Sequence, residues 1–213
     1  MSNSHKHVPE VVIKRLPRYY RYLSDLLKMD IRRISSSALS KKMSVTASQI
    51  RQDFNYFGGF GQQGYGYNVE YLHNAIGEIL GINDINNTII VGAGNLGRAM
   101  ANHDSFVKRG FEIIALFDND EELCGNQING KPVYHISELE RFIAEEKVDI
   151  AVLTVPKSCV QEMASRLIKA GVKGLLNFAY TEIAPESGIA VENVHLSDHL
   201  MTLSYKVKYD YLP

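Results

Sequence analysis

Hydrophobic positions follow helical spacing in the first part of the chain. In "PRYYRYLSDLLKM" (residues 17–29) apolar residues recur three and four apart, and Pro17 suits the first turn of such a helix. The segment "SSSALSKKM" (35–43) predicts a second, shorter helix. A third is expected from Ala47 to about Phe57, because "TASQ" has the form of a capping box. In such a box Thr46 satisfies the backbone N–H of Gln49, and the Gln49 side chain reaches back.

The predicted third helix has an apolar side for packing and a polar side that is free to form hydrogen bonds. Its polar side is formed by Ser48, Gln52 and Asn55, flanked by Gln49 and Arg51. A polar face on a short helix of this kind suits contact with base edges in the major groove of DNA.

A glycine-rich stretch follows the third helix. It holds five glycines in the nine residues from Gly58 to Gly66, and then Tyr65, Tyr67 and Val69 alternate. This pattern predicts a tight hairpin, or wing. Three helices and a wing describe a winged helix-turn-helix domain, which binds nucleic acid. A winged module that binds another protein is the alternative.

From Thr88 onward, apolar runs alternate with helical segments. The expected strands are "TIIVGAG", "FEIIALFDND", "PVYHI", "VDIAVLTVP" and "VKGLLNFA", with "IAVENVHL" as one further strand. One long helix is expected from Gly94 to about Lys108. These strands are continuously apolar, as in a parallel sheet that helices cover on both faces. The sequence therefore predicts an α/β chain in which a Rossmann-like, doubly wound parallel sheet follows the winged helix.

The polar linker "INDINN" (82–87) separates the two patterns. We expect a winged-helix DNA-binding domain over residues 1–81 and a Rossmann domain over 88–196. A C-terminal helix is expected over 197–213, with Leu200, Leu203 and Val207 on one side.

The balance of basic and acidic residues changes close to this linker. Residues 11–70 hold ten Lys and Arg against four acids, whereas residues 71–213 hold 12 bases and 19 acids. The first part is therefore suited to a polyanion such as DNA, although two solvated faces of unequal sign would give the same count. The overall composition, with 45% hydrophobic and 22% charged residues, is ordinary for a soluble globular protein.

The loop "GAGNLG" (92–97) has the spacing of a dinucleotide-binding fingerprint. A strand precedes it, a helix follows it, and Asp118 ends the next strand 21 residues after Gly97. A carboxylate at that place binds the ribose hydroxyls and repels a 2′-phosphate, and Asn119 and Asp120 supply no compensating arginine. We therefore predict NAD(H) as the cofactor, in preference to NADP(H).

Residues for catalysis or for metal binding do not stand out. His135, His195 and His199 lie in no recognisable motif, and Cys124 and Cys159 have no CxxC spacing. We predict no catalytic residue, no metal site, no membrane contact and a cytoplasmic location. A small NAD-dependent oxidoreductase with a fused helical domain remains the alternative function.

The order of these parts resembles the Rex family of redox-sensing transcriptional repressors. The segments that carry the resemblance are "RLPRYYRYL", "SQIRQDFNYFGGFGQQGYGY", "GAGNLG", "FD", "LTVP" and "LNFA". The resemblance implies a homodimer that binds a pseudo-palindromic operator in double-stranded DNA and leaves it when NADH binds. It also implies that the C-terminal helix is exchanged between the two subunits.

The resemblance assigns roles to residues of this sequence. The implied cofactor-binding residues are Gly92, Gly94, Asn95, Leu96 and Gly97 at the pyrophosphate, Asp118 at the ribose, and Val155, Pro156, Asn177, Phe178 and Ala179 at the nicotinamide end. The implied DNA-binding residues are Ser48, Gln49, Arg51 and Gln52 on the recognition helix, Lys41 and Lys42 before it, Tyr65 and Tyr67 in the wing, and Arg15 near phosphate.

Three departures from the family pattern alter these expectations. His103 stands where many members have a tyrosine, and His195 stands where they have an aspartate, with Asp198 one turn later. We hypothesise that Arg21, His103 and His195 or Asp198 form a pH-sensitive switch between the domains. Gln62 and Gln63 replace basic wing residues, which predicts a weaker dependence of DNA binding on salt. Tyr180 replaces a frequent proline, and we assign it no consequence.

Overall fold

The computed structural model describes residues 8–58, 60–62, 65–103, 105–184 and 188–209. Contacts within the chain divide it into two compact units, Met1–Asn83 and Asp84–Pro213, called the N-terminal and the C-terminal unit below. Each unit is described by itself.

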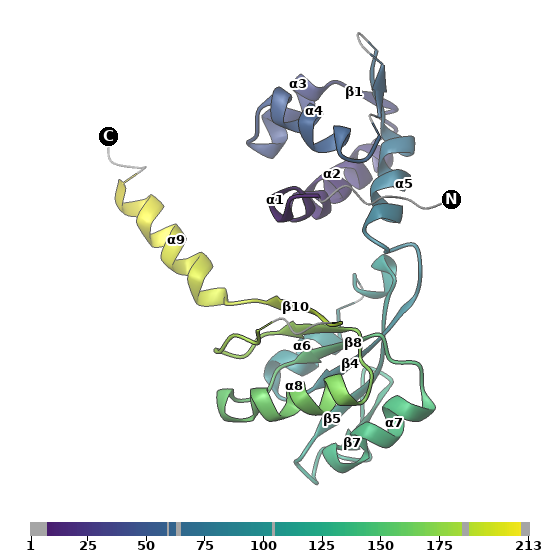
Figure 1. Ribbon diagram of the computed structural model, residues 1–213, viewed down its shortest axis with the longest axis vertical. Coiled ribbons are helices and arrows are strands. Elements are labelled where there is room, and N and C mark those ends of the chain that lie inside the picture. The colour runs from purple at the N-terminus through teal and green to yellow at the C-terminus, as the bar shows by residue number, and fades with distance from the viewer. Residues whose placement is uncertain (1–7, 59, 63–64, 104, 185–187, 210–213) are drawn as a thin grey trace. The chain divides into compact units, whose positions relative to one another are not determined.

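The N-terminal unit is a winged helix (Figure 1). Its helices are α1 (Glu10–Ile13), α2 (Leu16–Lys28), α3 (Ser36–Met43), α4 (Ala47–Asn55) and α5 (Val69–Ile79). Its strands are β1 (Arg33–Ile34), β2 (Gly61–Gln62) and β3 (Gly66–Asn68), which form an antiparallel sheet in the order β1-β3-β2. The predicted wing is thus the β2–β3 hairpin, and Gln63 lies outside the described residues.

Side-chain caps and one apolar core explain these helices. Thr46 accepts a hydrogen bond from the backbone N–H of Gln49 at 3.1 Å, as predicted. The reciprocal half of the capping box is wrong, because the Gln49 amide donates instead to Asp53. Helix α4 also ends at Asn55, two residues before the predicted Phe57, because the chain turns there toward Gly58, whose φ is +105°.

The core of the N-terminal unit joins its helices to the wing. Tyr19 of α2 lies edge-on to Phe54 of α4, with ring centroids 5.0 Å apart. Phe54 in turn meets Tyr67 of the wing at 5.1 Å. Burial of these large rings holds α4 against α2 and anchors the base of the hairpin.

The C-terminal unit is built on one seven-stranded sheet in the order β10-β9-β8-β4-β5-β7-β6. The strands are β4 (Asn86–Val91), β5 (Phe111–Asp118), β6 (Gln127–Ile128), β7 (Lys131–His135), β8 (Ile150–Leu153), β9 (Gly174–Asn177) and β10 (Ala190–Asn193). All neighbouring strands are parallel except β6 and β7. This order, which starts at β4 and extends to both sides, confirms the doubly wound fold predicted from the continuous apolar runs.

Helices cover both faces of this sheet (Figure 1). Helices α7 (Leu139–Glu145) and α8 (Val160–Lys169) pack on the face that carries Ile89 and Val91. Helix α6 (Asn95–Ala101) packs on the other face, with Ile90 of the same strand. Consecutive side chains of β4 therefore pack into the cores on opposite faces of the sheet, and for this reason the strand is apolar without interruption.

The long helix predicted from Gly94 to about Lys108 is two shorter elements. Helix α6 ends at Ala101, and a 3₁₀ turn, η1, spans Val107–Arg109. The chain turns between them so that Phe106 packs against the core beneath α6. Helical periodicity continues through this segment in the sequence, but in the structure Phe106 is partly buried against this core and the regular helix has already ended.

Helix α9 (Leu196–Tyr209) ends the described chain and has no buried residue. Its apolar side chains Leu200, Leu203 and Val207 are 66%, 54% and 62% exposed. Across the described residues, no helix is long and apolar enough to cross a membrane.

Candidate functional site

The loop after β4 is shaped by two glycines that approach other backbone atoms closely. Gly92 has a φ of +104°, and a Cβ on it would lie 2.7 Å from the carbonyl oxygen of Thr154. A Cβ on Gly97 would collide with the Gly92 carbonyl. Both positions therefore exclude a side chain, and the first turn of α6 lies tightly against the end of β4.

Gly94 differs from these two glycines. It is the N-cap of α6, and a Cβ on it would meet no protein atom within 4 Å. The fold itself therefore does not require a glycine there, whereas a ligand lying against the backbone would. The N-terminal N–H groups of α6, from Asn95, Leu96 and Gly97, suit the negative charge of a diphosphate.

Asp118, at the end of β5, holds the loop in place. Its Oδ2 accepts the N–H of Ala93 at 2.5 Å, and its Oδ1 accepts the N–H groups of Asn119 and Asp120 at 2.8 and 3.0 Å. Thr154 holds the opposite side, because its hydroxyl donates to the carbonyl of Gly92 at 2.7 Å. Sequence reasoning found Asp118 by its spacing but missed Thr154, although it lies within the "LTVP" segment.

These residues surround a cavity of about 530 Å³. It brings together the predicted cofactor residues Gly92, Gly94, Asp118, Val155 and Pro156. Its volume, its glycine loop and its carboxylate fit a nucleotide with a ribose and a diphosphate.

Arg166 of α8 also lines this cavity and was missed by sequence reasoning. Its guanidinium is not free, because Nε and Nη2 donate to the two carboxylate oxygens of Glu140 at 2.6 and 2.9 Å. Hydrogen bonding to Arg166 lowers the pKa of Glu140, and the same bond raises the pKa of Arg166. Glu140 thus neutralises Arg166, the one cation among the described residues that line this cavity.

Asn177, Phe178 and Ala179 are not among the residues that line the cavity. Asn177 is buried, and its amide donates to Thr181 and Asn193 at 2.6 and 2.8 Å. It therefore supports the turn between β9 and β10. Contact of these three residues with a nicotinamide stays a prediction.

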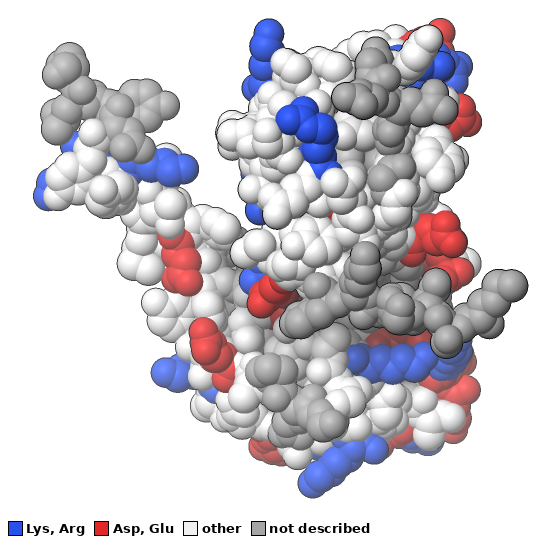
Figure 2. All heavy atoms as spheres, turned by 45° about the horizontal axis from the view of Figure 1, so that its top comes forward, with Lys and Arg blue, Asp and Glu red and all other residues white. Residues whose placement is uncertain are grey.

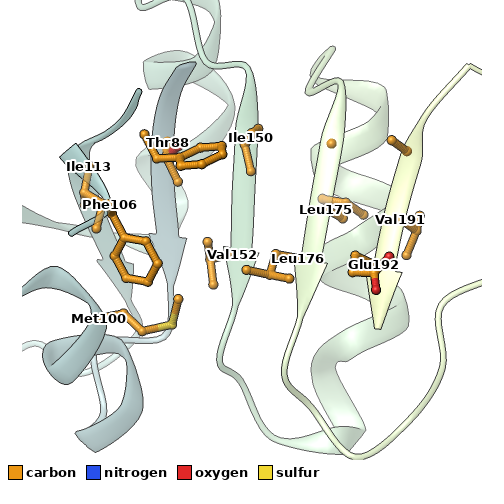
Figure 3. A pocket seen from close by; sticks show the side chains of 13 residues that line it. Thr88, Met100, Phe106, Ile113, Ile150, Val152, Leu175, Leu176, Val191 and Glu192 are labelled. Atoms are coloured by element: carbon orange, nitrogen blue, oxygen red, sulfur yellow. The ribbon is translucent and has the colours of Figure 1, made fainter. Parts of the chain in front are cut away.

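A second, apolar groove of about 360 Å³ lies on the α6 side of the sheet. Figure 3 shows Met100 and Phe106 beside β4, and Val152, Leu176 and Val191 along the neighbouring strands. Among the described residues that line it, Glu192 alone is charged and none is a predicted site residue.

The predicted DNA contacts on α3 and α4 lie at the surface. Lys41, Lys42, Ser48, Arg51 and Gln52 are exposed. The guanidinium of Arg51 donates to the hydroxyls of Ser36 and Ser48, at 3.0 Å each, and is therefore held between the N-terminal turns of the two helices. On the face that Figure 2 shows, the Lys and Arg side chains do not form one continuous patch.

The structure places the two wing tyrosines differently. Tyr65 is 71% exposed, and its backbone carbonyl accepts a hydrogen bond from Arg33. Tyr67 is only 7% exposed, and burial raises the pKa of its hydroxyl. The expectation that the Tyr67 ring faces DNA needs correction, since the ring packs on Phe54 and supports the wing from inside.

Arg15 was expected near a DNA phosphate. In the structure its guanidinium forms a bidentate ion pair with the buried carboxylate of Asp53, and the contact with phosphate stays a prediction. No sequence pattern singled out Asp53.

The four residues of the hypothesised switch are divided between the two units, with Arg21 in the N-terminal unit and His103, His195 and Asp198 in the C-terminal unit. Arg21 is exposed on α2, and His103 is exposed after α6, where its Nδ1 lies 2.7 Å from the hydroxyl of Ser105. His195 lies before α9 beside the ring of Tyr180, and its buried Nδ1 has no hydrogen-bond partner among the residues that the structure describes. Within the described ranges, no hydrogen bond or ion pair joins His103 to His195 or Asp198, and the switch stays a prediction. The described part of the chain also holds no cluster of three His, Cys, Asp or Glu suited to a metal ion.

Comparison with known proteins gives matches over both units. Residues 83–181 match the family described as "CoA binding domain", and residues 7–55 match "Putative DNA-binding protein N-terminus". A "Redox-sensing transcriptional repressor Rex" of Thermoanaerobacter sp. (strain X514) is 54% identical over 200 residues, which are 94% of this chain and 89% of the relative. The repressor of that name from Clostridioides difficile (strain 630) is 54% identical over 95% of this chain and 97% of its own length.

Solved structures agree with these matches. The chain is 52% identical, with a TM-score of 0.91, to a protein called RSP in complex with β-NAD+ and operator DNA. This match covers 96% of this chain and 94% of the other. A structure of RSP with β-NADH matches with a TM-score of 0.89 at 49% identity and covers 96% of both chains.

Proposed function

Because the chain belongs to the Rex family of redox-sensing transcriptional repressors, we propose that it represses transcription as a homodimer on operator DNA and is released when NADH binds. The relatives carry the names of repressors, and solved relatives bind operator DNA and NAD+ or NADH. The observation in this chain that supports the proposal best is one glycine cradle, closed by Asp118, on the same chain as a winged helix. A dehydrogenase, the alternative, has no support among the repressors that the chain resembles over nearly its whole length.

NAD(H) is the input of this sensor. The backbone at Gly94 and the first N–H groups of α6 would hold the pyrophosphate, and Asp118 would accept hydrogen bonds from the adenosine ribose. The nicotinamide supplies the difference between the oxidised and the reduced ligand. Val155 and Pro156 would lie toward it, with Asn177, Phe178 and Ala179 beyond.

DNA is the output. Helix α4 would enter the major groove with Ser48, Arg51 and Gln52, while Lys41, Lys42 and the wing residue Tyr65 would face the phosphate backbone. Such a repressor acts in the cytoplasm, where it meets both chromosome and nucleotide.

The two ligands would be coupled through the dimer. If NADH binds the form released from DNA 100-fold better than the DNA-binding form, the coupling is worth about 2.7 kcal/mol, and DNA must weaken NADH binding by the same factor. A second subunit would also cover the exposed apolar side of α9.

A mobility-shift assay on an operator duplex, with NADH and NAD+ titrated separately, tests the proposal. We expect NADH to abolish the shifted band at concentrations at which NAD+ does not. Absence of any sequence-specific complex, with either nucleotide or with none, would refute it.

A further inference from the structure

The carboxylate of Asp53 is buried in the N-terminal unit with four hydrogen-bond donors around it. Its exposed fraction is 0%. Arg15 donates from Nε to Oδ2 and from Nη2 to Oδ1, both at 2.7 Å. The hydroxyl of Tyr19 donates to Oδ2 at 2.8 Å, and the amide of Gln49 donates to Oδ1 at 3.0 Å. Each carboxylate oxygen thus accepts two hydrogen bonds, which is its usual capacity.

These bonds join the recognition helix to the start of α2. Asp53 and Gln49 are one turn apart on α4, whereas Arg15 and Tyr19 belong to the first turns of α2. Arg18, also on α2, donates to the carbonyl of Met43 at the end of α3 at 3.0 Å. Helix α2 therefore holds both helices of the helix-turn-helix by hydrogen bonds, which are directional. The apolar core also holds these helices, but hydrophobic contacts are not directional.

The charge of the carboxylate is compensated on site. Burial raises the pKa of Asp53, but the hydrogen bonds from Arg15, Gln49 and Tyr19 outweigh burial and hold the pKa below its usual value. The anion is therefore retained, and with it the bidentate geometry of Arg15.

Asp53 also fixes which way the Gln49 amide faces. A carboxylate only accepts hydrogen bonds, so the NH₂ group of Gln49 must face it and the carbonyl oxygen must face away. Within the described residues that oxygen accepts no hydrogen bond. Gln49 lies next to the exposed Ser48, on the flank of the polar face of α4.

We propose that Arg15 and Asp53 are positioning residues for operator recognition, which set the rotation of α4 and present the Gln49 carbonyl as an acceptor for a base amino group. This inference rests on the proposed function, because it assumes that α4 reads DNA. It assigns Arg15 a role inside the protein rather than on phosphate, and it makes Gln49 a specificity-determining residue whose free oxygen suits the amino group of adenine or cytosine.

Salt dependence distinguishes a positioning arginine from a phosphate contact. The probes are the operator duplex of the relative crystallised with NAD+ and operator DNA, and a shuffled duplex of the same composition. Each is titrated with the full-length protein and NAD+ from about 50 to 200 mM salt. Arg15→Gln is expected to lower the preference for operator over shuffled DNA about tenfold or more, the size of one lost base contact, and to leave the salt slope unchanged.

Two matched variants calibrate this result. Lys41→Gln removes an exposed cation of α3 and should lower the salt slope by about 0.9, with both duplexes weakened in parallel. Lys28→Gln removes an exposed cation from the far end of α2 and should change neither quantity. If Arg15→Gln lowers the slope as Lys41→Gln does, or leaves the operator preference unchanged, the inference is overturned.

Folding is checked separately. NADH affinity reports on the C-terminal unit, and thermal unfolding reports on the whole chain. If Arg15→Gln unfolds, the double variant Arg15→Met/Asp53→Leu replaces the ion pair by apolar volume, a change that buried pairs often tolerate. It should bind shuffled DNA like the wild type and lose the operator preference, and retention of the full preference would overturn the inference. A wild-type chain without operator preference would instead refute the proposed function.

Discussion

Asp118 accepts a hydrogen bond from the backbone N–H of Ala93, 25 residues earlier, at 2.5 Å. The carboxylate expected at the ribose therefore also shapes the glycine loop. Since two further N–H groups bond its other oxygen, Asp118 is held in place before any ligand arrives.

Replacement of Asp118 by Asn should weaken both NAD+ and NADH. An amide NH₂ cannot accept hydrogen bonds. Whichever carboxylate oxygen it replaces, either the N–H of Ala93 or the N–H groups of Asn119 and Asp120 lose their acceptor. The loss of charged hydrogen bonds predicts about 10- to 100-fold lower affinity for each nucleotide. Calorimetric titration measures this loss of affinity. The control is Asp120→Asn, because in the described part of the chain the Asp120 carboxylate accepts a hydrogen bond from the N–H of Glu122 and from no other group. Equal affinities of the Asp118 variant and the wild type would contradict the assigned role.

Gly94→Ala and Gly97→Ala form a pair with opposite outcomes. A methyl group at Gly97 collides with the Gly92 carbonyl, so that variant should unfold at a lower temperature. A methyl group at Gly94 meets no protein atom, so that variant should keep its melting temperature and lose nucleotide affinity. Thermal unfolding with and without NADH separates the two. Undiminished NADH binding by Gly94→Ala would mean that the nucleotide does not approach this backbone.

Glu140→Gln should make the site more tolerant of NADPH. The substitution removes the carboxylate that neutralises Arg166, and the freed guanidinium lines the same cavity as Asp118. A partly exposed Arg–phosphate pair is worth about 1 kcal/mol, which predicts roughly a fivefold smaller preference for NADH over NADPH. Competition between the two nucleotides measures this preference. Arg141, which pairs with Glu138 on the surface, provides the matched control Glu138→Gln.

Asp149 should give the C-terminal unit part of its acid sensitivity. A hydrogen bond from Lys173 lowers the pKa of Asp149, aided by the N–H of Asn87 against the effect of burial. Because the folded pKa is lowered, this contribution is complete above the unfolded value of about 3.9 and is lost as pH falls through the folded pKa. Asp149→Asn should therefore lower the free energy of unfolding at pH 7 by about 1 kcal/mol, and the difference from wild type should shrink toward pH 3. A difference that stays constant with pH would exclude this linkage.

His103→Phe tests the hypothesised switch. If Arg21, His103 and His195 or Asp198 communicate the state of the nucleotide, the variant should change the NADH concentration that releases operator DNA, and the hypothesised pH sensitivity of the switch predicts that this change differs from one pH to another. Mobility shifts at several pH values measure it. An NADH dependence equal to that of the wild type at every pH would remove His103 from the signal.

The sequence was most informative where one local pattern implies one structure. The glycine loop and Asp118 were found because a strand, a turn and an acid at fixed spacing leave few alternatives. Thr46 was found as a cap for the same reason. The parallel strands of the sheet followed from the apolar runs, whereas the short antiparallel strand β6 was not predicted. The break after Ala101 was not predicted either, because helical periodicity continues through it.

Residues that act across long sequence distances were missed. Arg15 and Asp53 are 38 positions apart, and their ion pair was missed because it exists only once α2 and α4 are packed together. Tyr67 alternates with Tyr65 in the wing, but alternation does not say which ring enters the core. Arg166 lines the nucleotide cavity only because α8 crosses that end of the sheet, and no motif marks it.

The exposed α9 has a consequence for assembly. Its 14 residues are close to the length at which an isolated helix is only marginally stable in water, and its own subunit buries none of them. The free energy that orders this helix must then come from association. Helix formation and subunit pairing are therefore coupled. In a single subunit at high dilution we expect residues 196–209 to be largely unfolded.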